Sequence, residues 1–130
     1  MEKLVEIEGR MVGMKCSAGT VRTYRELFGA DLILDMANIE KELTANKTLT
    51  PEAGKSAEQI VWAMCREYDK DTPGLLEFLG QFSPYFVYNA IAQAIYMWRD
   101  CVKTLNTTKK NKGKQRGSGR LLSFFCARRN

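Results

Sequence analysis

The chain has 130 residues, of which 45% are hydrophobic and 27% are charged, and it contains no histidine. A chain of this length can bury the core of one domain but has no room for a second full domain. Without histidine there is no imidazole to act as a general base or a metal ligand, which removes most hydrolase triads and most zinc sites. We therefore expect a protein that is not an enzyme, with no catalytic residue, no metal and no cofactor.

The cysteines are widely spaced and predict free thiols: Cys16, Cys65, Cys101 and Cys126. None belongs to the close Cys-x-x-Cys pairs that metal and redox sites use. The sequence shows no signal-peptide pattern, and its most apolar window, 85–98, is too short and too polar to cross a membrane. Unpaired cysteines without a secretion signal are typical of a reducing cytoplasm, which is the location we expect.

Charge divides the chain into an acidic body and a basic tail. Residues 1–106 hold 12 basic and all 15 acidic residues, a net charge of −3, whereas 107–130 hold 8 basic residues and no acid, a net charge of +8. The stretch 107–120 has no apolar residue, so we expect a disordered tail or linker. It also lacks interleaved aromatic residues, so any binding of nucleic acid through it would be weak and nonspecific.

The first expected elements are a hairpin and a helix. Residues 4–16 alternate between apolar and polar on both sides of Glu8-Gly9, a pattern that predicts a short β-hairpin. The apolar period then becomes helical and predicts a helix over about 18–28, which Gly29 ends.

Two longer helices are expected next. Apolar residues repeat at helical spacing from Asp31 to the polar stretch 44–48. The following helix begins after Thr50, where a first-turn proline follows, or at Ser56, where a capping box stands, and both starts are left open. One side of this helix is expected to be apolar, through Ile60, Val61, Met64 and Tyr68.

The last expected elements are a short helix after Pro73, ending before Gly80, and a long helix opened by Ser83-Pro84. The long helix has one continuous apolar face, formed by Val87, Ile91, Ala94, Ile95, Trp98, Val102 and Leu105. The expected fold class is a mainly helical α+β domain, with a short N-terminal β-hairpin, four or five helices and a disordered basic tail.

The long helix carries more aromatic side chains than one helix face can hold, namely Tyr85, Phe86, Tyr88, Tyr96 and Trp98. Some of them must therefore be exposed or meet a partner. Core packing explains most of the set, and a docking or oligomer surface is the alternative.

The first predicted helix contains the most specific motif, Tyr24-Arg25-Glu26-Leu27-Phe28-Gly29-Ala30-Asp31-Leu32. Together with the preceding hairpin, with Leu76-Glu77-Phe78-Leu79-Gly80-Gln81-Phe82 and with Ile95-Tyr96-Met97-Trp98, it resembles the tail assembly chaperones of long-tailed (siphovirus-type) bacteriophages. The resemblance covers about residues 1–106.

The resemblance implies a non-enzymatic role in virion morphogenesis. Such chaperones bind the tape measure protein, keep it soluble and help to recruit tail tube (major tail) subunits during tail assembly. They act in the cytoplasm of the host cell and are absent from the finished virion. A homo-oligomer is left open, and no contact with a membrane is expected.

The resemblance also implies a longer product made by programmed ribosomal frameshifting. An A-rich slippery run can encode Lys109-Lys110-Asn111, so our hypothesis places the join there. The tail 107–130 would then be the end of the short product or the start of a linker in the longer one.

The residues that we expect to contact partners come from the motif helix and the long helix: Tyr24, Arg25, Phe28, Tyr85, Tyr88, Tyr96 and Trp98. Core packing is the stronger expectation for each of them, above all for Phe28 and Trp98, and only the exposed ones can be hot spots. The alternative function is a small helical regulatory or nucleic-acid-binding protein that uses its basic C-terminal tail.

Overall fold

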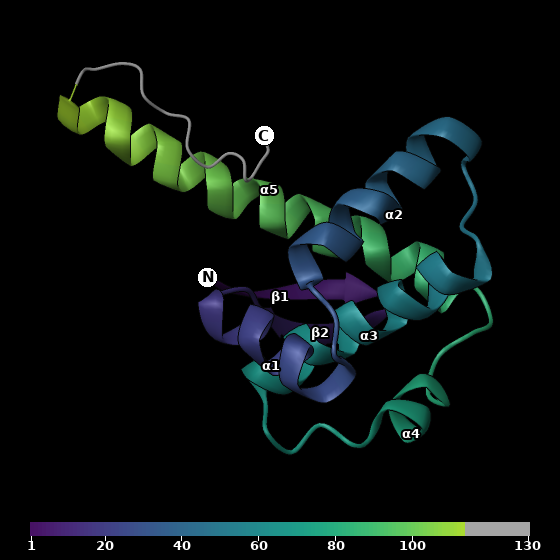
Figure 1. Ribbon diagram of the computed structural model, residues 1–130. Helices are drawn as coiled ribbons and strands as arrows, with labels where there is room; N and C mark the ends of the chain where they lie inside the picture. Colours follow the sequence, from purple (N-terminus) through teal and green to yellow (C-terminus); the bar gives the residue numbers. More distant parts are fainter. Residues whose placement is uncertain (114–130) are drawn as a thin grey trace. The chain divides into compact units, whose positions relative to one another are not determined.

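The computed structural model describes the backbone of residues 1–113 and the side chains of residues 1–101. The described elements are β1 (Glu2–Ile7), β2 (Arg10–Lys15), α1 (Ala18–Phe28), α2 (Leu32–Asn46), α3 (Pro51–Tyr68), α4 (Leu75–Leu79) and α5 (Phe86–Gly113). The expected class, a mainly helical α+β fold with an N-terminal hairpin and a long last helix, is confirmed (Figure 1).

The chain divides into two compact units, Met1–Met97 and Trp98–Asn130. Helix α5 begins in the first unit and continues in the second to Gly113, past the boundary that the change of charge predicts at 106. Extending a helix that already exists costs far less than starting one, and so the polar residues after 106 can prolong it. The predicted tail from residue 114 on, with Cys126, lies outside the described residues.

The hairpin forms where the alternation predicts it. Its two strands pair antiparallel with Glu2 opposite Lys15 and Ile7 opposite Arg10, so Glu8 and Gly9 alone make the turn. Both turn residues have positive φ, 53° and 80°, as a type I′ turn requires.

Helix α1 matches the predicted range of 18–28, because local hydrogen bonds fix both of its ends. Ser17 and Thr20 form a reciprocal capping box at the start, and Gly29 ends the helix in the left-handed conformation at φ 64°. Asp31 then caps α2 by accepting a hydrogen bond from the backbone N–H of Leu34.

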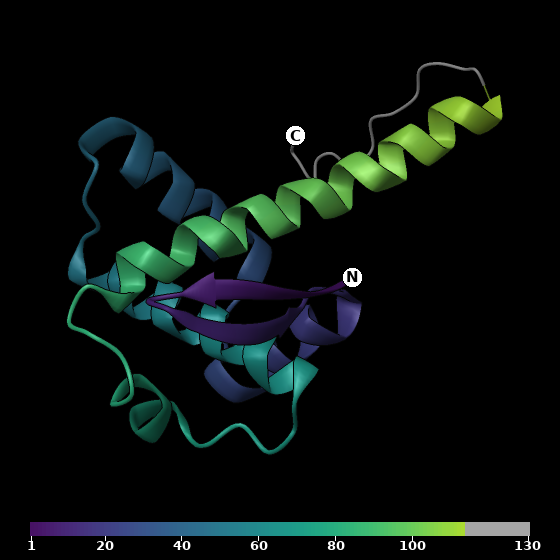
Figure 2. The same cartoon turned by 180° about the vertical axis from the view of Figure 1, so that it is seen from behind.

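Helix α3 is the centre of the first unit. It lies between the hairpin on one side and α1 and α2 on the other (Figures 1 and 2). The helix begins at Pro51 with Thr50 as its cap, which decides between the two predicted starts. The expectation of a single apolar face is wrong: every residue from 60 to 65 is buried, while Tyr68 is 41% exposed. A helix packed on both sides buries most of its circumference, and Tyr68 lies beyond the packed region.

Aromatic side chains join α4 to the beginning of α5. The rings of Phe78, Phe82 and Phe86 lie 4.5–5.8 Å apart, centre to centre. Only Phe78 of the α4 residues is buried, and α5 begins two residues after Pro84. Of the predicted apolar face of α5, Ile91, Ala94 and Ile95 are buried; Val87 and Trp98 are half-buried, and the side chains of Val102 and Leu105 lie outside the described residues.

Candidate partner-binding surfaces

Tyr24 of the motif helix is a core residue in the structure. Its side chain is fully buried, and its hydroxyl group donates a 2.6 Å hydrogen bond to Oδ2 of Asp35 in α2. Burial, together with this hydrogen bond, raises the pKa of the Tyr24 phenol well above its ordinary value, so that the hydroxyl group keeps its proton. Tyr24 therefore joins α1 to α2 and presents no surface to a partner.

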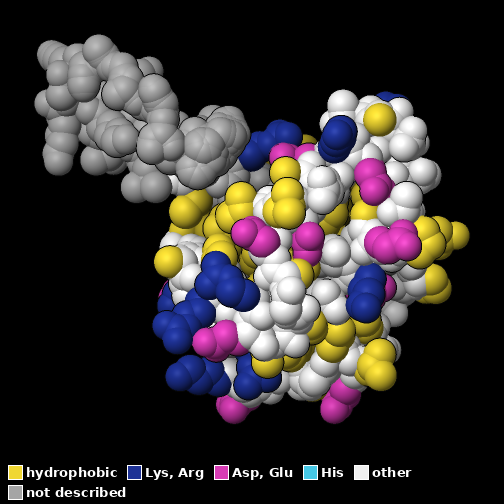
Figure 3. Space-filling model, viewed as in Figure 1, with side chains coloured by type: hydrophobic (Ala, Val, Ile, Leu, Met, Phe, Trp, Pro, Cys, Tyr) yellow, Lys and Arg dark blue, Asp and Glu magenta, His cyan; other side chains and the backbone are white. Residues whose placement is uncertain are grey.

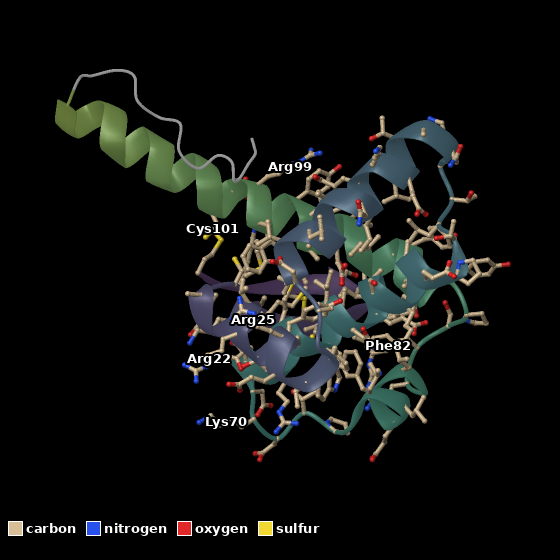
Figure 4. All side chains as sticks on the ribbon, viewed as in Figure 1. Arg22, Arg25, Lys70, Phe82, Arg99 and Cys101 are labelled. Atoms are coloured by element: carbon tan, nitrogen blue, oxygen red, sulfur yellow. The ribbon has the colours of Figure 1, made fainter. Side chains whose placement is uncertain are left out.

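Phe28 and Arg25 differ in their exposure. Phe28 is half-buried, and its ring lies 5.3 Å from that of Tyr24 and 5.9 Å from that of Trp62 in α3. Arg25 is exposed and lies toward the same side of the unit as Arg22 in Figure 4, where Lys and Arg side chains also gather in Figure 3. Of the three motif residues predicted to contact a partner, only Arg25 is freely accessible.

The tyrosines directly before and within α5 form an exposed stripe. Tyr85 is 71% exposed, Tyr88 41% and Tyr96 59%, and the small exposed side chain of Ala92 lies between Tyr88 and Tyr96. Positions 88, 92 and 96 recur at intervals of four residues, so they follow one side of α5. Tyr85 stands directly before the helix, and its backbone oxygen accepts a 3.1 Å hydrogen bond from the N–H of Asn89 in the first turn. The buried residues Phe86, Ala90, Ala94 and Met97 occupy the opposite side. We call Tyr85, Tyr88, Ala92 and Tyr96 the tyrosine stripe.

Two hydrogen bonds hold the beginning of this stripe in place. The hydroxyl group of Tyr88 accepts a 3.1 Å hydrogen bond from the backbone N–H of Leu49, which precedes α3. The backbone N–H of Tyr85 donates to Oγ of Ser83. The fourth aromatic residue predicted for this helix to contact a partner, Trp98, is half-buried and belongs to the second unit.

A carboxylate fixes the hairpin to the residues around the start of α5. Glu8 accepts hydrogen bonds from the backbone N–H and the hydroxyl group of Ser83, at 2.8 and 2.6 Å, and from Nδ2 of Asn89 at 2.7 Å. These hydrogen bonds, that of the Ser83 hydroxyl group above all, hold the pKa of Glu8 below its usual value. The sequence predicts Glu8 only as a turn residue, because its partners lie about 80 positions away.

A cleft of about 380 Å³ lies beside β2. We call it the hairpin cleft. It is lined by residues of β2, of the end of α3, of the loop that follows and of α4, among them Met11, Gly13, Tyr68, Asp69, Asp71 and Phe78. The Tyr68 ring lies against Gly13 so closely that a Cβ atom there would stand 2.2 Å from Cε1 of the ring. Sequence reasoning missed the cleft, since its walls come from segments that are more than 50 positions apart.

The cysteines of the described region form no disulfide with one another, and two of them, Cys16 and Cys65, are buried. Burial raises the pKa of the Cys65 thiol to about 12, which suppresses the reactive thiolate. No group of three or more Cys, Asp or Glu side chains among the described residues is placed to hold a metal ion. The described helices include none with the length and apolar character that a membrane span needs.

Comparison with known protein families, with curated proteins and with solved structures finds no match to this chain.

Proposed function

We propose that this chain is a non-enzymatic tail assembly chaperone of a long-tailed bacteriophage. In this role it binds the tape measure protein, keeps it soluble in the host cytoplasm and helps to recruit tail tube subunits. The proposal begins from the resemblance carried by the motif over 24–32 and the hairpin before it.

The tyrosine stripe is the observation that carries the proposal. Tyrosine is enriched at protein interfaces because its ring buries a large apolar area while its hydroxyl group still finds a hydrogen-bond partner. Tyr85 and Tyr96 expose more than half of their surface, although the fold buries Phe86 between them in the sequence. Such a row of apolar rings suits an amphipathic client helix, which a long tape measure protein would supply.

Co-expression with the tape measure protein encoded nearby tests the proposal. The full-length chain is expected to bring the tape measure protein into the soluble fraction and to co-purify with it. The double variant Tyr85→Ala, Tyr96→Ala is expected to lose most of this effect, because it removes the two most exposed rings of the stripe.

Leu76→Ala is the matched control, since Leu76 is 84% exposed but belongs to α4 and not to the stripe. A tape measure protein that stays insoluble with the unmodified chain would overturn the proposed function. Equal activity of the double tyrosine variant and the control would instead remove the stripe as the client site.

The alternative, a regulatory or nucleic-acid-binding protein, rests on the net charge of +8 over 107–130. A chain that ends at Asn106, and so lacks the whole basic segment 107–130, separates the two functions. The chaperone proposal expects the shortened chain to keep the client soluble, whereas the alternative expects it to lose its affinity for nucleic acid.

A further inference from the structure

The outer edge of β2 has free backbone hydrogen-bonding groups. The backbone groups of Met1 and Cys16 bond to each other in both directions, at 2.8 and 3.0 Å. Hydrogen-bonded pairs alternate along an antiparallel ladder, so in the observed register 3·14, 5·12 and 7·10 are also hydrogen-bonded pairs. The N–H and C=O groups of Met11 and Gly13 therefore point away from β1, and neither residue has another hydrogen bond to the described part of the chain.

This edge borders the hairpin cleft. Both Met11 and Gly13 line it, and the opposite wall is formed by the end of α3, the loop after it and α4. Gly13 is half-buried, and the atoms nearest to the place that a side chain would take there belong to the ring of Tyr68, which is 41% exposed. An extended peptide placed here can pair with both residues, since their outward groups recur every second position, as in a sheet.

The walls of the cleft set the chemistry of such a peptide. Met11 is 64% exposed, and the ring of Tyr68, which is 41% exposed, offers further apolar surface. Two carboxylates, of Asp69 and Asp71, stand in the same wall, and both side chains are exposed.

Arg10 is the one cationic residue among the described residues that line the cleft, and its guanidinium group already has partners within the chain. It donates a 3.2 Å hydrogen bond to the backbone oxygen of Gln81, and its guanidinium group lies 5.2 Å from the centre of the Phe82 ring. The first unit as a whole holds 10 basic and 14 acidic residues, a net charge of −4. This charge favours a basic partner and disfavours a second copy of the same unit, whose own carboxylates would meet these.

We propose that the hairpin cleft binds an extended segment of another polypeptide, in which apolar and basic residues alternate, by adding it as a third strand to the edge of β2. The backbone of Met11 and Gly13 supplies the ladder, the apolar wall takes one side of the segment, and Asp69 and Asp71 take its lysines or arginines. This site is separate from the tyrosine stripe. Its test therefore succeeds or fails independently of the proposed function.

The test measures binding of a fluorescein-labelled nine-residue peptide of alternating leucine and lysine to the full-length chain, by fluorescence anisotropy. The expected result is saturable binding, with at least tenfold weaker binding of the peptide in which glutamate replaces lysine. Asp69→Asn combined with Asp71→Asn should weaken binding about threefold to tenfold.

A proline substitution tests the strand edge itself. Met11→Pro removes the outward N–H without breaking a bond to β1, and about tenfold weaker binding is expected. Met11→Ala, which loses the side chain but keeps the N–H, should weaken binding less. Glu6→Pro is the matched control, because Glu6 stands opposite Met11 and its N–H points outward from the other edge; less than a twofold change is expected.

An NMR measurement on the unmodified chain keeps the test decisive if a proline variant fails to fold. Addition of the leucine-lysine peptide should shift the amide proton signals of Met11 and Gly13 and slow their exchange with solvent, while those of Glu2 and Glu6 on the other edge stay unchanged. Binding that leaves Met11 and Gly13 unaffected, or no binding by the leucine-lysine peptide at all, would overturn the proposal.

Discussion

Removal of the Tyr24 hydroxyl group should destabilise the first unit while changing its shape very little. The variant Tyr24→Phe keeps the ring that packs 5.3 Å from Phe28 but deletes the donor of the 2.6 Å hydrogen bond to Asp35. Because Tyr24 is fully buried, no water molecule replaces the lost hydroxyl group without opening the contact between α1 and α2.

The expected loss is about 2 kcal/mol. A hydrogen bond to a charged group contributes about 1.5–3 kcal/mol. The lower half of this range applies, since Asp35 is only half-buried and regains hydration on its exposed side. For a unit of this size, which is stable by about 5–15 kcal/mol, the loss lowers the melting temperature by roughly 10 °C.

Urea unfolding of the full-length chain, followed by circular dichroism at pH 7, measures this loss. Arg25→Ala, an exposed neighbour on the same helix, should stay within about 0.5 kcal/mol of the unmodified chain. In a double-mutant cycle with Asp35→Asn, the two substitutions should be coupled by about 1 kcal/mol. A loss below about 0.5 kcal/mol for Tyr24→Phe, or strict additivity in the cycle, would refute the structural role that we assign to this residue.

Three further predictions concern other parts of the chain. The folded-state pKa of Glu8 is lowered, so the Glu8 carboxylate stabilises the fold fully above its ordinary pKa of 4.5, and this stabilisation is lost as the pH falls through the folded-state pKa. The melting temperature of Glu8→Gln should therefore depend less on pH in the acid range than that of the unmodified chain. Trp62→Phe should cost about 1–3 kcal/mol in urea unfolding, since it removes the 2.8 Å hydrogen bond from Nε1 to the backbone oxygen of Pro73; an unchanged midpoint would contradict this. Iodoacetamide at pH 8, with peptide mass mapping, should modify half-buried Cys101 and leave Cys65 intact, and early labelling of Cys65 would speak against its burial.

The sequence predicted best those elements whose ends are fixed by local chemistry. The range 18–28 was predicted correctly because Ser17, Thr20 and Gly29 lie within a few positions of the helix ends that they fix. The hairpin was predicted for the same reason, since Glu8 and Gly9 alone decide its turn.

Burial and the hairpin cleft depend on tertiary packing, and the sequence did not predict them. The apolar period could not show that α3 is enclosed on two sides, which buries Trp62 and Cys65 as well as Ile60. Periodicity likewise gave no way to separate buried Tyr24 from exposed Tyr96, since both are tyrosines on amphipathic helices. The packing of α1 against α2 and α3 buries Tyr24, and Asp35 of α2 supplies its hydrogen-bond partner. No local sequence pattern predicts the hairpin cleft, and Gly13 is the one residue in it whose type hints at a close contact.

The long-range bonds of the hairpin have a consequence for the order in which the chain acquires its structure. Glu8 bonds to Ser83 and Asn89, and Sγ of Cys16 lies 3.9 Å from the backbone oxygen of Met97, so the hairpin at the start of this unit is completed by the last part of the unit. A ribosome releases the hairpin while most of the residues that cover it are still unmade. We expect the unit to fold more slowly than a helical bundle of its length, because closing these large loops must precede the contacts that stabilise them.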